Sequence, residues 1–119
     1  MRQYIIVNES LGMSPGKIAA QVAHATTGYA LNAVRCESQE VGENLLLWFS
    51  RHKQRKIVTK SRGFEMELLP NILIDLGIPF YAVYDTGANE VTPGSLTAIA
   101  IGPQHKELLP KWFAKLRLL

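Results

Sequence analysis

GMSPGKIAAQVAHAT, at residues 12–26, is the stretch around which this chain is organised. It follows a strand-like run at residues 4–7 and has the features of a loop that opens into a helix. Ser14 can cap the free amides of a helix N-terminus, and Pro15 suits the first helical position. The apolar residues that follow recur at helical spacing, so the pattern predicts a helix from Pro15 to about Arg35.

The beginning of this helix carries a polar row. On a helix of 3.6 residues per turn, Lys17, Gln21 and His24 fall on one face at spacings of four and three. A cation, an amide and an imidazole beside the amides of a helix N-terminus predict a site for an anionic or strongly polar ligand. Two residues also have ordinary interpretations, Lys17 as a solvated lysine and His24 as a hydrogen-bonded structural histidine.

The glycines of this stretch do not fit a loop for nucleoside triphosphates. Such a loop needs four residues between its glycines and a Ser or Thr after its lysine. Here Gly12 and Gly16 enclose three residues, and Ile18 follows Lys17.

The composition indicates one globular domain, residues 1–119, of which 47% are hydrophobic. The first residues are charged too soon for a signal peptide, and no apolar run reaches membrane-spanning length. We therefore expect a cytoplasmic protein with no membrane partner. The one cysteine, Cys36, excludes an internal disulfide and a cysteine-based metal cage.

Apolar periodicity predicts two more internal helices, at residues 41–51 and 63–76, the second of them ended by Gly77. Pro70 lies inside the second helix, so we expect a kink or a break near Leu69.

The remaining apolar runs predict strands and a last helix. Strands are expected at residues 4–7, 56–60, 80–84 and 95–101. We expect Gly102 and Pro103 to stop the last strand and residues 104–119 to form a terminal helix on the sheet. Helices alternating with strands predict an α/β sandwich. The last two strands are joined by a loop too short for a helical crossover, which makes the sheet mixed if they are neighbours.

A basic stretch, residues 51–62, holds six of the thirteen Lys and Arg residues and no acid. Together with a net charge of +3 and a pI near 9.2, it indicates a surface for a polyanion. Lys53, Arg55 and Lys56 are its candidate contacts. A solvated strand edge is the alternative, since lysine commonly protects exposed edges. We favour nucleic acid because the net charge and the clustering agree.

A second polar segment begins at Asp85, which ends an apolar strand and precedes a glycine turn. In α/β proteins this position often contacts a ligand. An Asx-turn that satisfies its own loop amides is the alternative, and spacing alone does not separate the two.

These motifs together resemble a known family. KIAAQVAHA, at residues 17–25, is similar to the KIAAQxxHA signature of type II peptidyl-tRNA hydrolases, the archaeal and eukaryotic class. DTG at residues 85–87 and PGSLTAIAIGP at residues 93–103 resemble that family's DAGxTQ and PGTxTVLxIGP segments. The likeness spans nearly the whole chain. Four residues depart from the pattern: Thr86 stands for Ala, Asn89 for Thr, Glu90 for Gln and Ser95 for Thr.

The resemblance implies a three-layer α/β/α sandwich with a four-stranded mixed sheet, often a homodimer, that hydrolyses the ester joining a peptide to tRNA. The sequence contains no metal-ligand constellation and suggests no covalent serine triad, so we expect attack by water with no cofactor and no metal. Carried over by position, the family's functional residues are Lys17, Gln21, His24, Asp85, Asn89 and Thr97. With the basic stretch, the expected substrate contacts are Gln21, Ser95, Lys53, Arg55 and Lys56.

Ester hydrolysis needs a positioned water, a group that takes its proton, and donors for the developing oxyanion. Either Asp85 or His24 can orient or deprotonate the water. Lys17 can bind a tRNA phosphate or stabilise the oxyanion, while Gln21 and Thr97 can hold the ester or the water.

Two other functions are compatible with the sequence. The departures at Asn89 and Glu90 are compatible with a related RNA-binding domain that has lost catalysis. A small-molecule phosphate binder that uses the helix start at residues 14–17 is the other alternative, and in that case the basic stretch contributes nothing to affinity.

Overall fold

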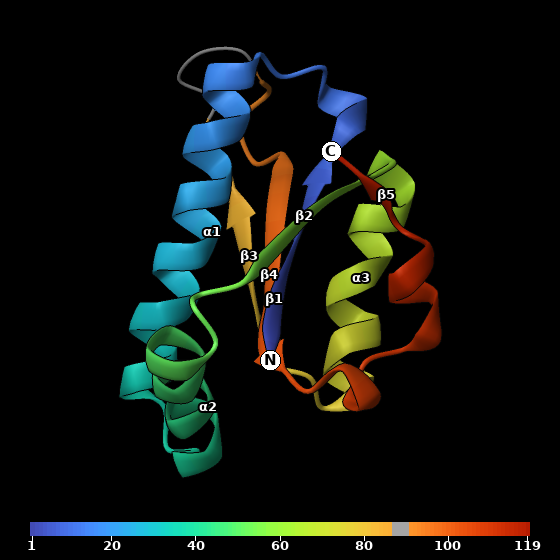
Figure 1. The fold of residues 1–119 in the computed structure, drawn as a ribbon. Coiled ribbons are helices and arrows are strands. Elements are labelled where there is room, and N and C mark those ends of the chain that lie inside the picture. The colour runs from blue at the N-terminus through green and yellow to red at the C-terminus, as the bar shows by residue number, and fades with distance from the viewer. Residues whose placement is uncertain (87–90) are drawn as a thin grey trace.

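A mixed β-sheet runs through the centre of the molecule. The computed structural model describes residues 1–86 and 91–119, except the side chains of residues 63 and 64. Within them, five strands form one sheet in the order β3-β4-β1-β2-β5 (Figure 1). The strands are β1 Arg2–Asn8, β2 Lys56–Ser61, β3 Phe80–Tyr84, β4 Leu96–Gln104 and β5 Arg117–Leu118. β1 and β2 are parallel, whereas β4 is antiparallel to β1 and β3, and β5 to β2. A mixed sheet was predicted correctly, but the expected number of four strands was wrong.

Helices cover both faces of this sheet. The α-helices are α1 Pro15–Arg35, α2 Gln39–Arg51 and α3 Gly63–Leu76. Short 3-10 helices are η1 Glu9–Leu11, η2 Lys106–Leu108 and η3 Lys111–Lys115. α1 and α2 lie on one face and α3 on the other (Figure 1). No helix in the described residues is long and apolar enough to cross a membrane.

α1 has the predicted bounds and the predicted cap. The Ser14 side chain accepts a hydrogen bond from the Lys17 amide at 3.3 Å, and Pro15 occupies the first helical position. α2 begins two residues before the predicted start because Ser38 caps it, accepting from the Val41 amide at 3.4 Å.

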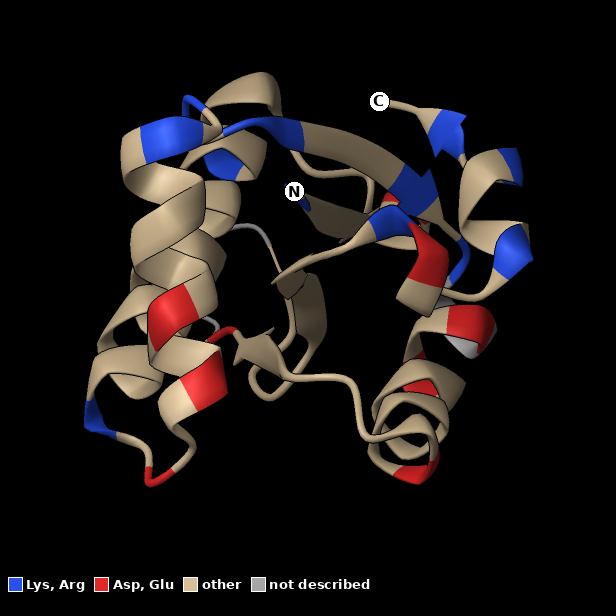
Figure 2. Ribbon diagram, turned by 60° about the horizontal axis from the view of Figure 1, so that its bottom comes forward, with Lys and Arg blue, Asp and Glu red and all other residues tan. Residues whose placement is uncertain are grey.

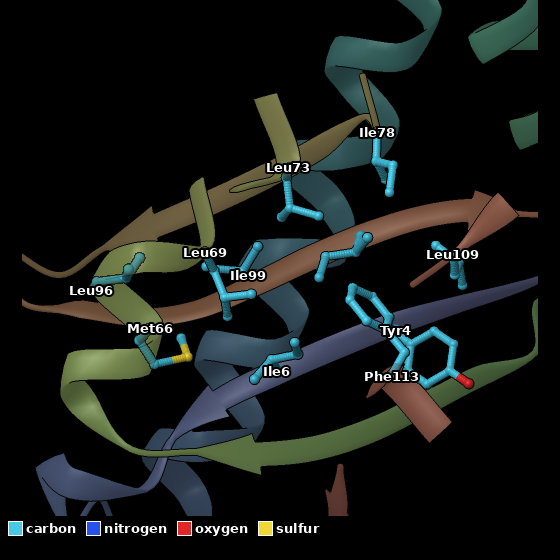
Figure 3. Packing of buried hydrophobic residues seen from close by; sticks show 11 residues of the cluster. Tyr4, Ile6, Met66, Leu69, Leu73, Ile78, Leu96, Ile99, Leu109 and Phe113 are labelled. Carbon is cyan, nitrogen blue, oxygen red and sulfur yellow. The ribbon is translucent and has the colours of Figure 1, made fainter. Parts of the chain in front are cut away.

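Successive side chains of β1 belong to two hydrophobic cores, one on each face of the sheet. Tyr4 and Ile6 pack under α3, where Figure 3 shows them beside Met66, Leu69 and Phe113. The intervening Ile5 belongs to the other core, under α1 and α2. Both faces of the central strands are therefore buried, which explains why β1 and β4 are continuous apolar runs rather than alternating ones.

Pro70 does not break α3. The helix is continuous from Gly63 to Leu76, so of the expected kink or break near Leu69 the break was wrong and the kink stays a prediction. Proline removes one intrahelical hydrogen bond, but residues on both sides of it are anchored on the sheet. Leu69 and Leu73 are 3% and 0% exposed. Gly77 ends the helix with a left-handed φ of 68°, as predicted.

β4 does not stop at Gly102 and Pro103. It continues to Gln104, which pairs with Arg2 of β1 across an irregularity in the register. Gly102 has a φ of 81°, and a Cβ atom there would lie 2.7 Å from the backbone nitrogen of Gln104. A residue without a side chain thus lets the strand pass through a bulge-like distortion.

The C-terminal segment is not the single helix that we expected. It forms η2, η3 and then β5, in which Arg117 pairs with Lys60 and Leu118 with Thr59. Pro110 supplies no amide hydrogen to a helix that would cross it. The segment still packs on the sheet as predicted, through Leu109, Phe113 and Leu116.

The topology gathers several chain segments at one edge of the sheet. β1, β2 and β3 point the same way, so their carboxyl ends meet there, together with the start of β4. The N-terminus of α1 lies at the same edge, at the top of Figure 1. In α/β proteins this edge is the usual place for a ligand.

Candidate functional site

A lysine–aspartate pair lies at this edge. The ammonium group of Lys17, in the first turn of α1, donates a hydrogen bond to Oδ1 of Asp85 at 2.8 Å. The two side chains are only 13% and 6% exposed, so water screens this pair less than a surface ion pair. Lys17 sits at the positive end of the helix dipole, and the Asp85 carboxylate offsets that unfavourable position.

The backbone fixes Asp85 immediately after β3. Its amide donates to the carbonyl of Ser95 at 2.9 Å, and its own carbonyl accepts from the Gly94 amide at 2.8 Å. The Ser95 hydroxyl donates to the carbonyl of Thr92 at 2.7 Å and so closes the turn before β4. Ser95 therefore supports Asp85 through its backbone, and its side chain does not line the pocket around Lys17.

Two further polar side chains extend the pair into the protein. Nε2 of Gln21 donates to Oδ1 of Asp85 at 3.4 Å, and Oε1 of Gln21 accepts from the Thr97 hydroxyl at 2.5 Å. The reverse orientation of the Gln21 amide would turn its oxygen toward the Asp85 carboxylate. Both groups are acceptors, so no hydrogen bond would form between them. Gln21 is 2% exposed and Thr97 is fully buried. The hydrogen bonds thus run from the Thr97 hydroxyl to the Gln21 amide and from that amide to the Asp85 carboxylate. The Lys17 ammonium group donates to the same carboxylate oxygen.

These groups open into a pocket of about 450 Å³ that also contains His24. Its lining residues are Gly16, Lys17, Ala20, Gln21, His24, Asp85 and Thr86. The polar row of α1 therefore faces one space, with the exposed His24 imidazole at its rim. Thr97 lies behind Gln21 rather than in this lining.

Three residues of this lining were not predicted from the sequence. Gly16 and Ala20 leave space at the helix N-terminus, and Thr86 adds a hydroxyl beside Asp85. Ala20 was recognisable, because it lies three residues after Lys17 on the same helix face. Thr86 was noted only as a departure from the family pattern. Asn89, predicted to be catalytic, lies outside the described residues.

The structure does not bring the basic candidates into this pocket. Lys53 and Arg55 are exposed in the turn between α2 and β2. Lys56 is the strand partner of Gln3 near the start of β1. At about 3.3 Å per residue, this position lies about 17 Å from the carboxyl ends of the two strands, where the pocket is. Its ammonium group lies 4.9 Å from the ring centroid of Trp48, within cation–π range.

His52 lies in the same turn as these cations. Desolvation lowers the pKa of His52 below its usual value. The N-terminal ammonium group of Met1 lies 3.1 Å from Nδ1 of His52 and lowers this pKa further.

The arrangement suits chemistry on an anionic substrate. A cation, a helix N-terminus and polar side chains meet at one pocket, where they can bind a phosphate or stabilise developing negative charge. Within residues 1–86 and 91–119, no three His, Cys, Asp or Glu side chains are grouped to hold a metal ion. The fold and the pocket together define an α/β protein with a polar site at the carboxyl ends of its parallel strands.

Comparison with known proteins gives the family. The family model for peptidyl-tRNA hydrolase PTH2 matches residues 1–119, and the chain belongs to that family. A peptidyl-tRNA hydrolase of Methanopyrus kandleri is 37% identical over 119 positions, which cover 99% of this chain and 97% of the relative. The peptidyl-tRNA hydrolases of Sulfolobus acidocaldarius and Methanocaldococcus jannaschii are each 36% identical, with both chains covered completely.

Proposed function

We propose that this protein hydrolyses the ester bond between a peptide and tRNA in the pocket of Lys17, Gln21, His24 and Asp85. The single observation that carries the proposal is the connected Lys17–Asp85–Gln21 cluster, which sits at a helix N-terminus in a chain of the peptidyl-tRNA hydrolase family. Attack by a water molecule needs a proton acceptor and an anion-stabilising group, and the pocket offers both without a cofactor.

Lys17 stabilises negative charge in this proposal. Lys17 lines the pocket from the first turn of α1, at the N-terminus of that helix. A charge that develops on the ester oxygen would meet a fixed cation and a helix N-terminus there. The hydrogen bond to Asp85 holds the flexible lysine side chain in place, which reduces the entropy lost when substrate binds.

His24 is the group that we assign as general base. Oδ1 of Asp85 already accepts hydrogen bonds from Lys17 and Gln21, which suits that carboxylate to holding and orienting its neighbours. The imidazole of His24 is exposed at the pocket rim, where a water molecule can reach it. Imidazole is the most common general base in enzymes.

Gln21 and Thr97 are positioning residues in this scheme. The buried Thr97 hydroxyl fixes the Gln21 amide, and that amide fixes the Asp85 carboxylate. Because Thr97 is fully buried, its effect on substrate would pass through Gln21.

A pH profile of turnover with an N-blocked aminoacyl-tRNA tests the assignment of the base. His24→Ala should lower kcat by about a hundredfold and remove the acid limb of the profile. Thr27→Ala, an exposed change one turn further along α1, is the matched control and should leave the profile unchanged. A His24→Ala protein that keeps the acid limb would assign the base to Asp85 instead. No turnover by the unaltered protein would favour the RNA-binding domain without catalysis.

The proposal extends to the setting of the enzyme. The separate cores on the two sheet faces support a three-layer α/β/α sandwich in one domain, residues 1–119. The exposed cations at Lys53, Arg55 and Lys56 support binding of the tRNA body outside the pocket. Because such a substrate is found in the cytoplasm, we expect the enzyme to act there. The family resemblance also implies a homodimer, and sedimentation velocity tests it.

A further inference from the structure

A second pocket lies on the opposite face of the sheet, between the end of β2, α3 and the C-terminal segment. Its volume is about 490 Å³, within the usual range of small-molecule sites. Apolar side chains form much of its wall: Leu68, Leu69, Ile72, Trp112 and Leu116. Trp112 is 39% exposed and packs against the buried Phe113, with ring centroids 4.5 Å apart. The pocket wall thus contains a half-exposed aromatic ring that packs against a buried one.

Cations surround this apolar wall. Lys60, Arg62, Lys115 and Arg117 all line the pocket. Glu9, which lies just outside it, pairs with Arg117 at 2.8 Å and with Lys60 at 3.7 Å. Neither Arg62 nor Lys115 forms an ion pair with a carboxylate in the part of the chain that the structure describes.

Glu65, the acid among the described residues of the lining, is hydrogen-bonded to the end of β2 and to the residue that precedes α3. Its Oε2 accepts from the Ser61 hydroxyl and from the Arg62 amide, the latter at 3.3 Å. The Ser61 hydrogen bond is the main reason why the pKa of Glu65 is lowered, so this carboxylate is charged but already hydrogen-bonded. The rim keeps a net positive charge.

The pocket lies within a longer cationic band. Figure 2 shows Lys and Arg residues from the end of α2 along β2 to the C-terminal segment, and several of the Asp and Glu residues on α2 and α3. Glu9 and Glu65 lie beside the cations of the pocket. A single anion would need only the pocket rim. Several cations beside an aromatic ring fit a polymer with regularly spaced negative charges and flat apolar groups.

We propose that this pocket holds one unpaired nucleotide of an RNA, with its base against Trp112 and its phosphates at Arg62 and Lys115. The inference deepens the proposed function and rests on its RNA substrate. The pocket and the Lys17 site lie on opposite faces of the sheet, so the bound nucleotide is not the esterified 3′ end. The RNA is held at two places, once for chemistry and once for affinity.

Fluorescence titration with a single-stranded adenylate tetramer tests the proposal. Trp112 is the exposed tryptophan, while Trp48 is 3% exposed, so base stacking should quench mainly the Trp112 emission. The variants at position 112 lack this signal, so the anisotropy of a dye-labelled tetramer measures their affinity. Trp112→Leu should weaken binding by about tenfold, since it keeps an apolar wall but loses the ring. Trp112→Phe, which keeps a ring, should retain affinity within about threefold. Phe49→Ala, an exposed aromatic change on α2 outside the pocket, is the matched control.

An abasic tetramer with the same phosphates separates base stacking from charge. It should bind more weakly than the adenylate and quench little. Equal binding of the two tetramers, or no loss in Trp112→Leu, would overturn the proposal. Quenching of Trp112 by phosphatidylglycerol vesicles but not by RNA would also overturn it and point to a lipid surface.

Turnover separates failure of this inference from failure of the proposed function. Trp112→Leu should raise KM for peptidyl-tRNA and leave kcat unchanged for an N-blocked aminoacyl-adenosine, which has the ester but no tRNA. Normal turnover with unchanged KM in Trp112→Leu rejects the pocket and keeps the hydrolase. RNA affinity that depends on Trp112, in a protein without turnover, keeps the pocket and rejects the hydrolase.

Discussion

The ammonium nitrogen of Lys17 lies 2.8 Å from Oδ1 of Asp85, although 68 positions separate the two residues in the chain. Lys17 belongs to the first turn of α1, and Asp85 follows the last residue of β3. The contact exists because α1 packs across β3 and β4 with its N-terminus at their common edge. The pair therefore forms only when α1 has packed on the assembled sheet.

Loss of either partner should disable the enzyme while leaving the fold intact. Lys17→Ala removes the cation that stabilises negative charge, and Asp85→Asn removes the carboxylate that holds it. We expect each change to lower kcat by about a hundredfold or more. Steady-state turnover of peptidyl-tRNA measures the effect, and full activity in both variants would exclude a catalytic role for the pair.

Thermal melting should show that the two charges depend on each other. Lys17→Met leaves the carboxylate of Asp85, which is 6% exposed, without its cation, so the melting temperature should fall. Adding Asp85→Asn to Lys17→Met removes the uncompensated charge and should restore part of the loss. A double variant that melts lower than Lys17→Met alone would contradict this coupling.

The Thr97 hydroxyl should act only through Gln21. Thr97→Val keeps the side-chain volume but removes the donor to Oε1 of Gln21, which frees the amide to rotate away from Asp85. We expect kcat to fall by about tenfold, the effect of a single misplaced supporting group. In a Gln21→Ala background the same change should have almost no further effect, whereas two additive losses would mean that Thr97 acts independently.

Local signals predicted the regular elements near the site well. Ser14 and Pro15 defined the start of α1, and Gly77 defined the end of α3, because caps and glycine act within a few residues. The C-terminal segment could not be predicted in this way. Leu109, Phe113 and Leu116 are spaced as in a helix, but the segment's structure depends on a distant pairing with β2.

The site was predicted as a set of residues rather than as a geometry. Lys17, Gln21 and His24 share a face because helical spacing is local. Their meeting with Asp85, and the position of Thr97 behind Gln21, depend on strand order, which no short window of sequence contains. For the same reason the basic stretch was predicted as one unit. In the structure β2 separates the two ends of this stretch, so that one lies at the amino ends and the other at the carboxyl ends of the parallel strands.

Affinity for tRNA should depend on salt through the turn between α2 and β2. Changing Lys53, Arg55 and Lys56 together to Ala should weaken binding and make the slope of log affinity against log salt shallower by about two to three, about one unit for each phosphate that the variant no longer neutralises. Arg35→Ala, at the end of α1, is the control for removal of a surface cation elsewhere. Filter binding at several salt concentrations measures the slope, and an unchanged slope in the triple variant would remove this turn from the interface.

Gly28 should be the position in α1 that least tolerates a side chain. A Cβ atom there would lie 2.3 Å from Cε1 of Tyr81 on β3, so alanine must displace either the tyrosine ring or the helix. We expect Gly28→Ala to lower the free energy of unfolding by about 1–3 kcal/mol, a typical cost of overpacking.

Gly16→Ala is the matched control for this prediction, because it makes the same chemical change in the same helix. A Cβ atom at Gly16 would have no neighbour within 4 Å. Alanine there should raise the free energy of unfolding by about 0.5–1 kcal/mol through lower backbone entropy of the unfolded chain. Urea titration of both variants gives the comparison. If Gly28→Ala is as stable as Gly16→Ala, the tyrosine ring can move aside at little cost, and the close approach of α1 to β3 does not depend on glycine.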